Sequence, residues 1–293
     1  MEQTLLFQQN NGLLSPITCV SVGPKGRYLA YGANDSTISV VDTRTGKKKQ
    51  TVTGHESKVT GVSFKDNRYH LLSCSWDQTT RLWDTKENDE PIILRHNSEV
   101  KALTTALDQN KGASGARDGE VKVFSLNTLK NLRNVQAHQS EITGVAFIDN
   151  GSKLVTATWN GECKIWDLSS YELIQELPTQ NDHIRSIATS PDGVGLVIGL
   201  HGGGILSIDL DNPSEIGRLK GHTDVVEALS IDSTGDRLVS GSWDRTLRVW
   251  SLNSMKEISS GTLLTGITAV EWSPTNEVVY SGDFSGALIS WSI

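Results

Sequence analysis

The chain has 293 residues, with 27 Lys or Arg against 34 Asp or Glu, and its formal net charge is −7 at pH 7. The two signs are interspersed, without the basic stripe that a general nucleic-acid binder normally carries, so direct nucleic-acid binding is not expected. No stretch approaches the roughly 20 apolar residues of a membrane helix, which excludes membrane insertion by that route.

The chain start and the cysteines indicate a compartment. MEQTLLFQQNNG has an acidic residue where a signal peptide has basic ones, and its apolar run is too short. Cys19, Cys74 and Cys163 cannot all pair, and each lies in a predicted strand, so we interpret them as buried apolar residues in a reducing compartment. No metal-ligand spacing links them. We therefore expect a cytoplasmic protein with no metal and no other cofactor.

A hairpin pattern recurs along the chain. Ser73 to Trp83, SCSWDQTTRLW, and Ser240 to Trp250, SGSWDRTLRVW, each read as a strand, a tight turn opening with Asp, and a second strand ending in Trp. Aligned on such turns, the chain contains seven units that are 41 or 42 residues apart, with the turn residues Asp35, Asp77, Asp118, Asn160, Gly202, Asp244 and Ser285.

The first strand of each unit departs from strict alternation. A regular strand places apolar residues two apart, yet Val226 and Leu229 are three apart, as are Val59 and Val62. We therefore predict a β-bulge near the start of each first strand.

Units of this length, with four strands and a Trp-Asp ending, are typical of a propeller blade. Trp83-Asp84 and Trp166-Asp167 carry the dipeptide, and Gly54-His55 and Gly221-His222 carry the second landmark of the repeat. Over its whole length the chain resembles the WD-repeat β-propeller family. The resemblance implies an all-β fold, a single seven-bladed β-propeller with four antiparallel strands per blade.

The last unit ends at Ile293, directly after its third strand. We therefore expect the chain start, 1–12, to supply the closing strand of the last blade, which removes an open sheet edge. In chain order, the expected blades of this one domain span 13–54, 55–95, 96–137, 138–179, 180–221, 222–262 and 263–293.

The resemblance also implies a hydrogen-bonded chain inside each blade. In the second and sixth units its members are His55, Ser73, Asp77 and Trp83, and His222, Ser240, Asp244 and Trp250. Because this set recurs, a structural role is a better interpretation than a Ser-His-Asp hydrolase triad, and no catalytic residue is expected. Three units depart from the set. The third keeps His96, Ser114 and Asp118 but has Phe124 in place of Trp, and the fourth keeps His138, Thr156 and Trp166 but has Asn160 in place of Asp. The fifth replaces the whole set with Gln180, Ile198, Gly202 and Ile208.

The residues immediately before the turns are the candidate site, because the resemblance places them around the central channel. Large aromatic and charged residues of this kind are enriched in binding hot spots. For any single Trp, packing over its neighbouring turn is an equally good interpretation; the ring as a whole favours binding. The predicted binding residues are the apolar anchors Trp76, Trp159, Trp243 and Phe284, with Arg117, Arg185 and His201 setting the polarity.

Side chains three and five residues past each His position are expected to face the same channel. They include Lys58, Arg185 and Glu227. Arg117, Arg185 and His201 near Trp159 fit an acidic or aromatic segment, whereas Glu141 and Glu227 fit a Lys or Arg held over an aromatic ring. The sequence does not choose between them.

These observations favour a non-enzymatic scaffold or adaptor that binds a peptide or domain of a larger assembly, with the propeller itself monomeric. Its partners would be other proteins or peptides of a multiprotein complex. A reader of methylated basic peptides is the alternative, and an enzyme with a site in the channel mouth is a third hypothesis.

Overall fold

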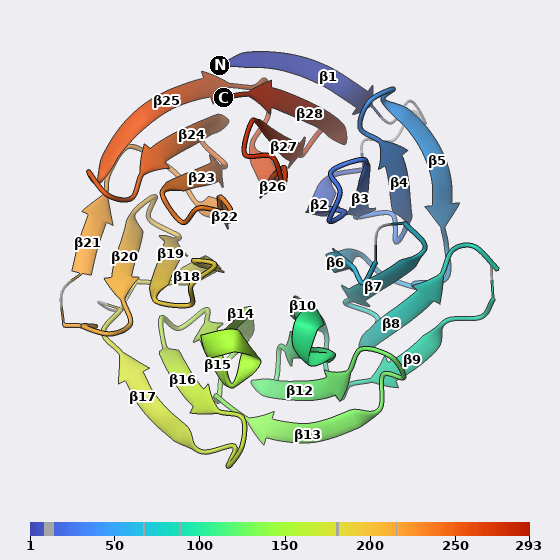
Figure 1. The fold of residues 1–293 in the computed structure, drawn as a ribbon, viewed down its shortest axis with the longest axis vertical. Coiled ribbons are helices and arrows are strands. Elements are labelled where there is room, and N and C mark those ends of the chain that lie inside the picture. Colours follow the sequence, from blue (N-terminus) through green and yellow to red (C-terminus); the bar gives the residue numbers. More distant parts are fainter. Residues whose placement is uncertain (9–14, 67, 88, 180–181, 215) are drawn as a thin grey trace.

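The computed structural model describes residues 1–8, 15–66, 68–87, 89–179, 182–214 and 216–293. Within these ranges, 28 strands form seven four-stranded antiparallel sheets arranged in a ring (Figure 1). Each sheet is one blade, with its first strand nearest the axis and its last strand at the rim. The predicted all-β, seven-bladed propeller is therefore confirmed.

The sheets follow one another along the chain. Blade 1 consists of β2 (Ile17–Val22), β3 (Tyr28–Ala33), β4 (Ile38–Asp42) and β5 (Lys47–Val52). Blade 2 consists of β6 (Val59–Phe64), β7 (His70–Ser75), β8 (Thr79–Asp84) and β9 (Ile92–Arg95). Blade 3 consists of β10 (Val100–Ala106), β11 (Lys111–Ala116), β12 (Glu120–Ser125) and β13 (Asn131–Gln136). Blades 4 and 5 consist of β14 (Ile142–Ile148), β15 (Lys153–Thr158), β16 (Cys163–Asp167) and β17 (Leu173–Leu177); and β18 (Ile184–Thr189), β19 (Gly195–Leu200), β20 (Ile205–Asp209) and β21 (Ile216–Leu219). Blades 6 and 7 consist of β22 (Val226–Ile231), β23 (Arg237–Ser242), β24 (Thr246–Ser251) and β25 (Lys256–Thr262); and β26 (Ile267–Trp272), β27 (Val278–Asp283), β28 (Ala287–Ser292) and β1 (Glu2–Gln8).

Blade 7 is closed by the start of the chain. β1 pairs antiparallel with β28 from Glu2 opposite Ser292 to Gln8 opposite Ala287, and both chain ends lie beside this blade (Figure 1). The predicted closure is confirmed. The remainder of the expected closing segment, 9–12, lies outside the described residues.

The predicted bulges are present in the first strand of every described blade. In β6, for example, Val59 pairs with Ser75 and Gly61 with Cys74, so Thr60 has no partner in the ladder. The same shift skips one residue in β2, β10, β14, β18, β22 and β26. A bulge re-aims the residue that it leaves unpaired, and all seven such residues line the central cavity: Thr18, Thr60, Lys101, Thr143, Arg185, Glu227 and Thr268.

Apolar residues fill the space between neighbouring blades. Val59 and Val62 of β6 pack with Ala30 and Val40 of blade 1 in one buried cluster. Gly32 permits the close approach of the two sheets, because a Cβ atom there would lie 2.5 Å from a methyl group of Val59. Close packing of this kind makes the ring stiff, so side chains at its centre are held in fixed positions.

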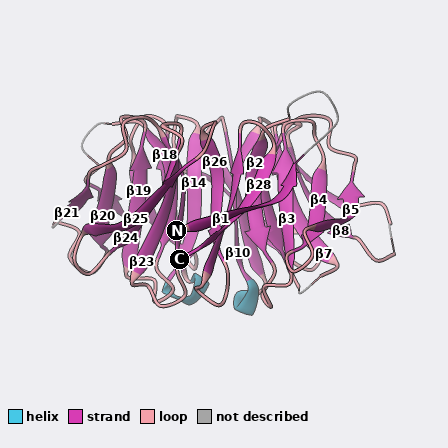
Figure 2. Cartoon of the chain, turned by 90° about the horizontal axis from the view of Figure 1, so that it is seen from above, coloured by secondary structure: helices cyan, strands magenta, loops and turns pink. Residues whose placement is uncertain are grey.

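The two ends of the ring differ. The 3-10 turns η1 (Leu107–Gln109) and η2 (Asp149–Gly151) follow the ends of β10 and β14, and they lie on one face (Figure 2). The bulged residues lie at the starts of the first strands and therefore at the opposite face. We call the cavity opening at that opposite face the mouth. In the described part of the chain, no helix has the length and apolar character needed to cross a bilayer.

Candidate partner-binding face

One backbone hydrogen bond in each described blade builds the mouth. The residue before the turn donates its N–H to the carbonyl of the residue 18 positions earlier, at 2.9–3.1 Å. Each bond places two side chains next to each other at the mouth. The donors, which we call the mouth residues, are Asn34, Trp76, Arg117, Trp159, His201, Trp243 and Phe284, and their acceptors are Pro16, Lys58, Glu99, Glu141, His183, Val225 and Gly266.

The ammonium groups of two lysines lie against the indole ring of Trp76. The Nζ atom of Lys58 lies 3.4 Å from the centre of the indole ring, and the Nζ atom of Lys101 lies 5.1 Å from it. Both distances are within the range of cation–π attraction. Burial, followed by the positive charge of Lys101, lowers the pKa of Lys58 to about 8.

Trp159 is enclosed by two imidazoles of the next blade. His183 stacks on it with a centroid distance of 4.4 Å and an interplanar angle of 7°, and His201 meets it edge-on at 5.2 Å. The Nδ1–H of His183 donates to the carbonyl of Trp159 at 2.7 Å. Trp159 and His201, both predicted site residues, are therefore in contact.

Trp243 and Phe284 form an edge-to-face pair with centroids 5.4 Å apart. They pack over Gly266, where a Cβ atom would lie 2.9 Å from the Phe284 ring and 3.0 Å from Cα of Trp243. Leu264, two residues earlier, is 94% exposed. Leu264 was not among the predicted site residues. Its signal in the sequence is that the residue after the His position is apolar here and in the first unit (Leu14), but polar in the other five (Glu56, Asn97, Gln139, Asn181 and Thr223).

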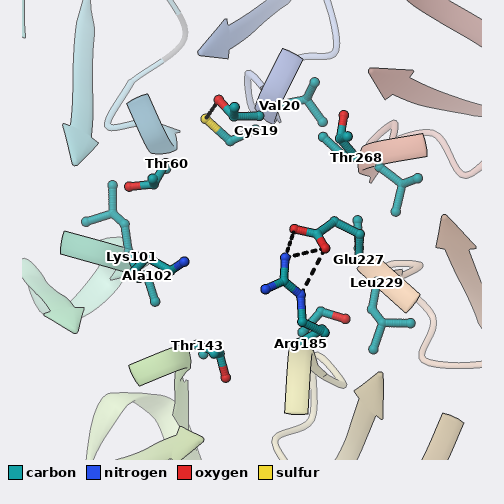
Figure 3. A pocket seen from close by; sticks show the side chains of 18 of the residues that line it. Cys19, Val20, Thr60, Lys101, Ala102, Thr143, Arg185, Glu227, Leu229 and Thr268 are labelled. Atoms are coloured by element: carbon teal, nitrogen blue, oxygen red, sulfur yellow. Dashed lines mark hydrogen bonds and ion pairs between the residues drawn. The ribbon is translucent and has the colours of Figure 1, made fainter. Parts of the chain in front are cut away.

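The two predicted arginines behave differently. Arg185 forms a two-pronged ion pair with Glu227, with Nε to Oε2 at 3.0 Å and Nη2 to Oε1 at 2.6 Å (Figure 3). Its guanidinium carbon also lies 5.6 Å from the Trp159 ring and 5.7 Å from the Trp243 ring. Arg185 thus joins the two aromatic groups.

Arg117 faces carboxylates. Its Nη1 atom lies 3.4 Å from Glu99 Oε1, and its Nε atom lies 3.6 Å from Glu141 Oε2. No interaction among the described residues links the Arg117 side chain directly to Trp159. The expected grouping of Arg117 with Trp159, Arg185 and His201 is therefore not what the structure shows. The reason is the pairing over 18 residues, which sets Glu99 beside Arg117.

The mouth opens into a central cavity of 440 Å³. Lys101, Arg185 and Glu227 point into it (Figure 3). The hydroxyls of Thr60 and Thr268 instead donate to the backbone carbonyls of Val100 and Ile17 in the neighbouring blades. Among its described lining residues, three are cationic and one is a carboxylate: Lys58, Lys101, Arg185 and Glu227. Lys101 pairs at 2.8 Å with Glu141, which lies outside the lining. No carboxylate of the described chain forms an ion pair with Lys58.

The predicted chain of hydrogen bonds lies inside the blades, away from the mouth. In blade 6, His222 Nδ1 is 2.8 Å from Asp244 Oδ2, His222 Nε2 is 2.7 Å from Ser240 Oγ, and Trp250 Nε1–H donates to the same Oγ at 2.8 Å. His55, Asp77, Ser73 and Trp83 repeat the arrangement in blade 2, at 2.6, 2.7 and 2.8 Å. Ser73 and Ser240 are fully buried, so neither hydroxyl can reach a substrate.

Proton positions follow from this geometry. Burial lowers the pKa of His222 even though the Asp244 carboxylate opposes the shift. The pKa of Asp244 would rise on burial, but hydrogen bonds from Thr246 and the nearby His222 lower it to about 2. His222 is therefore neutral at pH 7, donates Nδ1–H to Asp244 and accepts the Ser240 hydroxyl at Nε2.

Two other blades modify the chain of hydrogen bonds. In blade 4, Glu162 occupies the acidic position at 2.7 Å from His138 Nδ1, a contact that was not predicted. In blade 3, His96 Nε2 contacts Ser114 at 3.2 Å, but Nδ1 is buried with no hydrogen-bond partner in the described structure. Asp118 does not bond it, contrary to expectation, and its carboxylate instead accepts the N–H of Glu120 at 3.1 Å. Leu13 and Gln180, the equivalents of the His in blades 1 and 5, lie outside the described residues.

Among the described residues, no cluster brings together three or more His, Cys, Asp or Glu side chains that could hold a metal ion. The three cysteines are free. Burial raises the pKa of the Cys19 and Cys163 thiols to about 12.

Comparison with known proteins agrees with the geometry. The family described as WD domain, G-beta repeat, matches residues 7–42, 46–84, 129–167 and 213–251, together just over half of the chain. The chain belongs to the WD40-repeat family. These matches include the hydrogen-bonded turns of blades 2, 4 and 6.

Individual WD-repeat relatives match slightly less than half of the chain. Periodic tryptophan protein 2 of Saccharomyces cerevisiae is 30% identical over 130 residues, 43% of this chain and 14% of its own length. Autophagy-related protein 16 of Arabidopsis thaliana is 27% identical over 142 residues (48% and 28%), and Nuclear distribution protein PAC1 of Fusarium vanettenii is 29% identical over 144 (45% and 32%). The matched segments thus span less than a third of each of these relatives.

Proposed function

We propose that this WD40 propeller is a non-enzymatic interaction scaffold that binds a peptide or domain of a larger protein assembly at the mouth. The observation that carries the proposal is the exposure of large aromatic side chains around one opening: Trp76 is 36%, Phe284 37% and Trp243 38% exposed. Large aromatic groups that gather on an accessible surface generally mark an interaction site.

The surroundings of these rings suit binding. Stacking, ion pairs and cation–π contacts already hold Trp159, Arg185 and Trp76 in position. A partner therefore gains contact area without ordering the propeller, which lowers the entropic cost of association. Rigid display of fixed side chains is the mechanism that we assign to the scaffold.

The relatives do not point to one partner. Two of them are named for different processes, autophagy and nuclear distribution, and one fold serves many functions. The proposal therefore covers a partner protein and not a particular assembly. Three unpaired cysteines, of which Cys74 and Cys163 are buried and Cys19 is partly exposed, are compatible with the cytoplasm as the location. We propose that the propeller acts as a monomer.

The alternative reader of methylated Lys is less favoured because of charge. Such a reader needs aromatic faces that are open to an incoming cation. Here Lys58 occupies the Trp76 face, and Arg185 lies between Trp159 and Trp243. An incoming methylammonium would have to displace a cation of the protein itself.

The test is partner capture from a lysate of the cells that express the chain, quantified by mass spectrometry. One bait carries Trp76→Ala, Trp159→Ala and Trp243→Ala. The matched control carries Ile93→Ala, Leu173→Ala and Ile258→Ala, which remove exposed apolar side chains from the outer strands β9, β17 and β25. We expect the first bait alone to lose its specific partners, with both baits melting cooperatively. Unchanged capture by the tryptophan variant would refute the mouth as the binding face.

A further inference from the structure

The side chains of the mouth also indicate the chemistry of the bound segment. We propose that the partner presents the carboxylate of an Asp or Glu side chain to Lys58 at the channel mouth, beside an apolar residue that contacts Trp243 and Phe284. This inference rests on the proposed function, because it requires a partner on the same face.

Among the described residues, Lys58 is the lining charge of the cavity that the protein itself does not neutralise. Of its charged lining residues that the structure describes, Arg185 is neutralised by Glu227, and Lys101 by Glu141 at the rim. Lys58 is left with no ion pair in the described chain. The cavity therefore offers one uncompensated positive charge, and a ligand with a single negative charge at that point is electrostatically complementary.

Lys58 is held at the mouth by two contacts with Trp76. Its backbone carbonyl accepts the N–H of Trp76 at 3.1 Å, and its ammonium group lies over the same residue's ring at 3.4 Å. Lys101 shares that ring at 5.1 Å. Two ammonium groups on one indole repel each other, and a carboxylate placed between them would relieve that repulsion and form charge-assisted hydrogen bonds.

The apolar part of the ligand follows from the other side of the mouth. Trp243 and Phe284 both line the cavity and are more than a third exposed, and Leu264 projects into solvent near them. A segment that reaches Lys58 therefore meets aromatic surface as well. We infer an acidic residue flanked by an apolar one.

The proposal predicts a pH dependence. The charges that act on Lys58 are Lys101, Glu227, Arg185 and Glu141, and the free Lys58 has a pKa of about 8 because of burial and Lys101. A bound carboxylate raises the pKa of Lys58, so above pH 8 the binding of the ligand is coupled to protonation of Lys58. Binding is then strongest below pH 8 and weakens about tenfold between pH 7 and pH 9.

The experiment uses the full chain and immobilised nonapeptide pools with randomised flanks. The central residue of each pool is fixed as Glu, Gln, phosphoserine, Lys or trimethyl-Lys. We expect retention to be strongest on the Glu pool, to fall at least about fivefold with Lys58→Gln, and to weaken from pH 7 to pH 9. Lys58→Arg should keep binding at pH 7 and abolish the pH dependence, because arginine does not titrate in this range.

The other possible outcomes refute either the carboxylate or the mouth as the binding face. Equal retention on the Glu and Gln pools, stronger retention on the phosphoserine, Lys or trimethyl-Lys pool, or no retention on the Glu pool overturns the carboxylate. The double variant Trp243→Ala/Phe284→Ala separates this failure from failure of the proposed function. If the pools bind through the aromatic pair but without regard to charge, the mouth binds and the carboxylate is wrong. If the double variant is retained as well as the parent protein, the mouth is not the binding face.

Discussion

Lys58 and Trp76 are joined twice, by the hydrogen bond from the Trp76 N–H to the Lys58 carbonyl at 3.1 Å and by the ammonium group 3.4 Å from the indole centre. The same 18-residue relation holds in the other described blades. Each blade therefore presents a pair of neighbouring side chains at the mouth, and the identity of the pair decides whether it is charged, aromatic or neutral.

Gly266 controls the aromatic pair of blade 7. Gly266→Ala places a methyl group against the Phe284 ring and Cα of Trp243, so Phe284 must move. We expect partner capture to fall about fivefold, while the melting temperature changes little. Gly204→Ala is the control on the same side of the propeller, because its Cβ would meet only a Leu200 methyl group at 3.4 Å. Equal capture by the two variants would show that this pair does not contribute.

Closure by β1 should contribute measurably to stability. Deleting residues 1–8 removes the strand that pairs along β28 and exposes a sheet edge. We expect the melting temperature to fall by at least about 5 °C. Leu5→Thr, which alters an exposed side chain and keeps the strand, should have little effect. An unchanged melt for the deletion would contradict closure as a source of stability.

The hydrogen bonds of blade 6 should behave as one unit. Ser240→Ala leaves the Trp250 indole N–H and the His222 ring nitrogen buried without a partner, at a cost of about 2–4 kcal/mol of unfolding free energy. Trp250→Phe removes the same indole hydrogen bond, so the double variant should lose less than the sum of the two single losses. Chemical denaturation measures all three, and simple additivity would show that the two residues are not coupled.

His96 should make stability depend on pH. Burial and the positive Lys122 lower the pKa of its imidazole to about 3, whereas an unfolded histidine titrates near about 6.5. Between these values the unfolded state binds the extra proton, so stability falls as the pH falls, by up to about 1.4 kcal/mol per pH unit. Unfolding free energies of His96→Gln should depend less on pH than those of the parent between about pH 4.5 and 6.5. Identical slopes would contradict a neutral buried His96.

The fold could be predicted from the sequence because its signals are local and repeated. The spacing of the turns gives the blades, and the three-residue step from Val59 to Val62 locates a bulge. Closure follows from an unpaired third strand at Ile293 and an apolar segment at the other end of the chain. Each of these features is a property of one strand or one turn.

The site could be predicted only in part, because it depends on contacts between blades. The sequence identifies Trp76 as a mouth residue, but not that Lys101 of the next blade reaches its ring. It identifies Arg117, but not that two carboxylates hold it. Glu162 replaces the expected turn residue Asn160 because its longer side chain reaches His138 from two positions further along the chain. Such contacts depend on side-chain conformation and on the distance between sheets.

Side-chain oxidation footprinting, with and without the captured partner, tests the central claim most directly. Trp76, Trp243 and Phe284 at the mouth and Ile93, Leu173 and Ile258 on the outer strands are all more than a third exposed in the free protein, so each group controls for the other. The account predicts that the partner lowers oxidation of the three mouth residues and leaves the outer three unchanged. Protection of the outer strands with an unprotected mouth would contradict it.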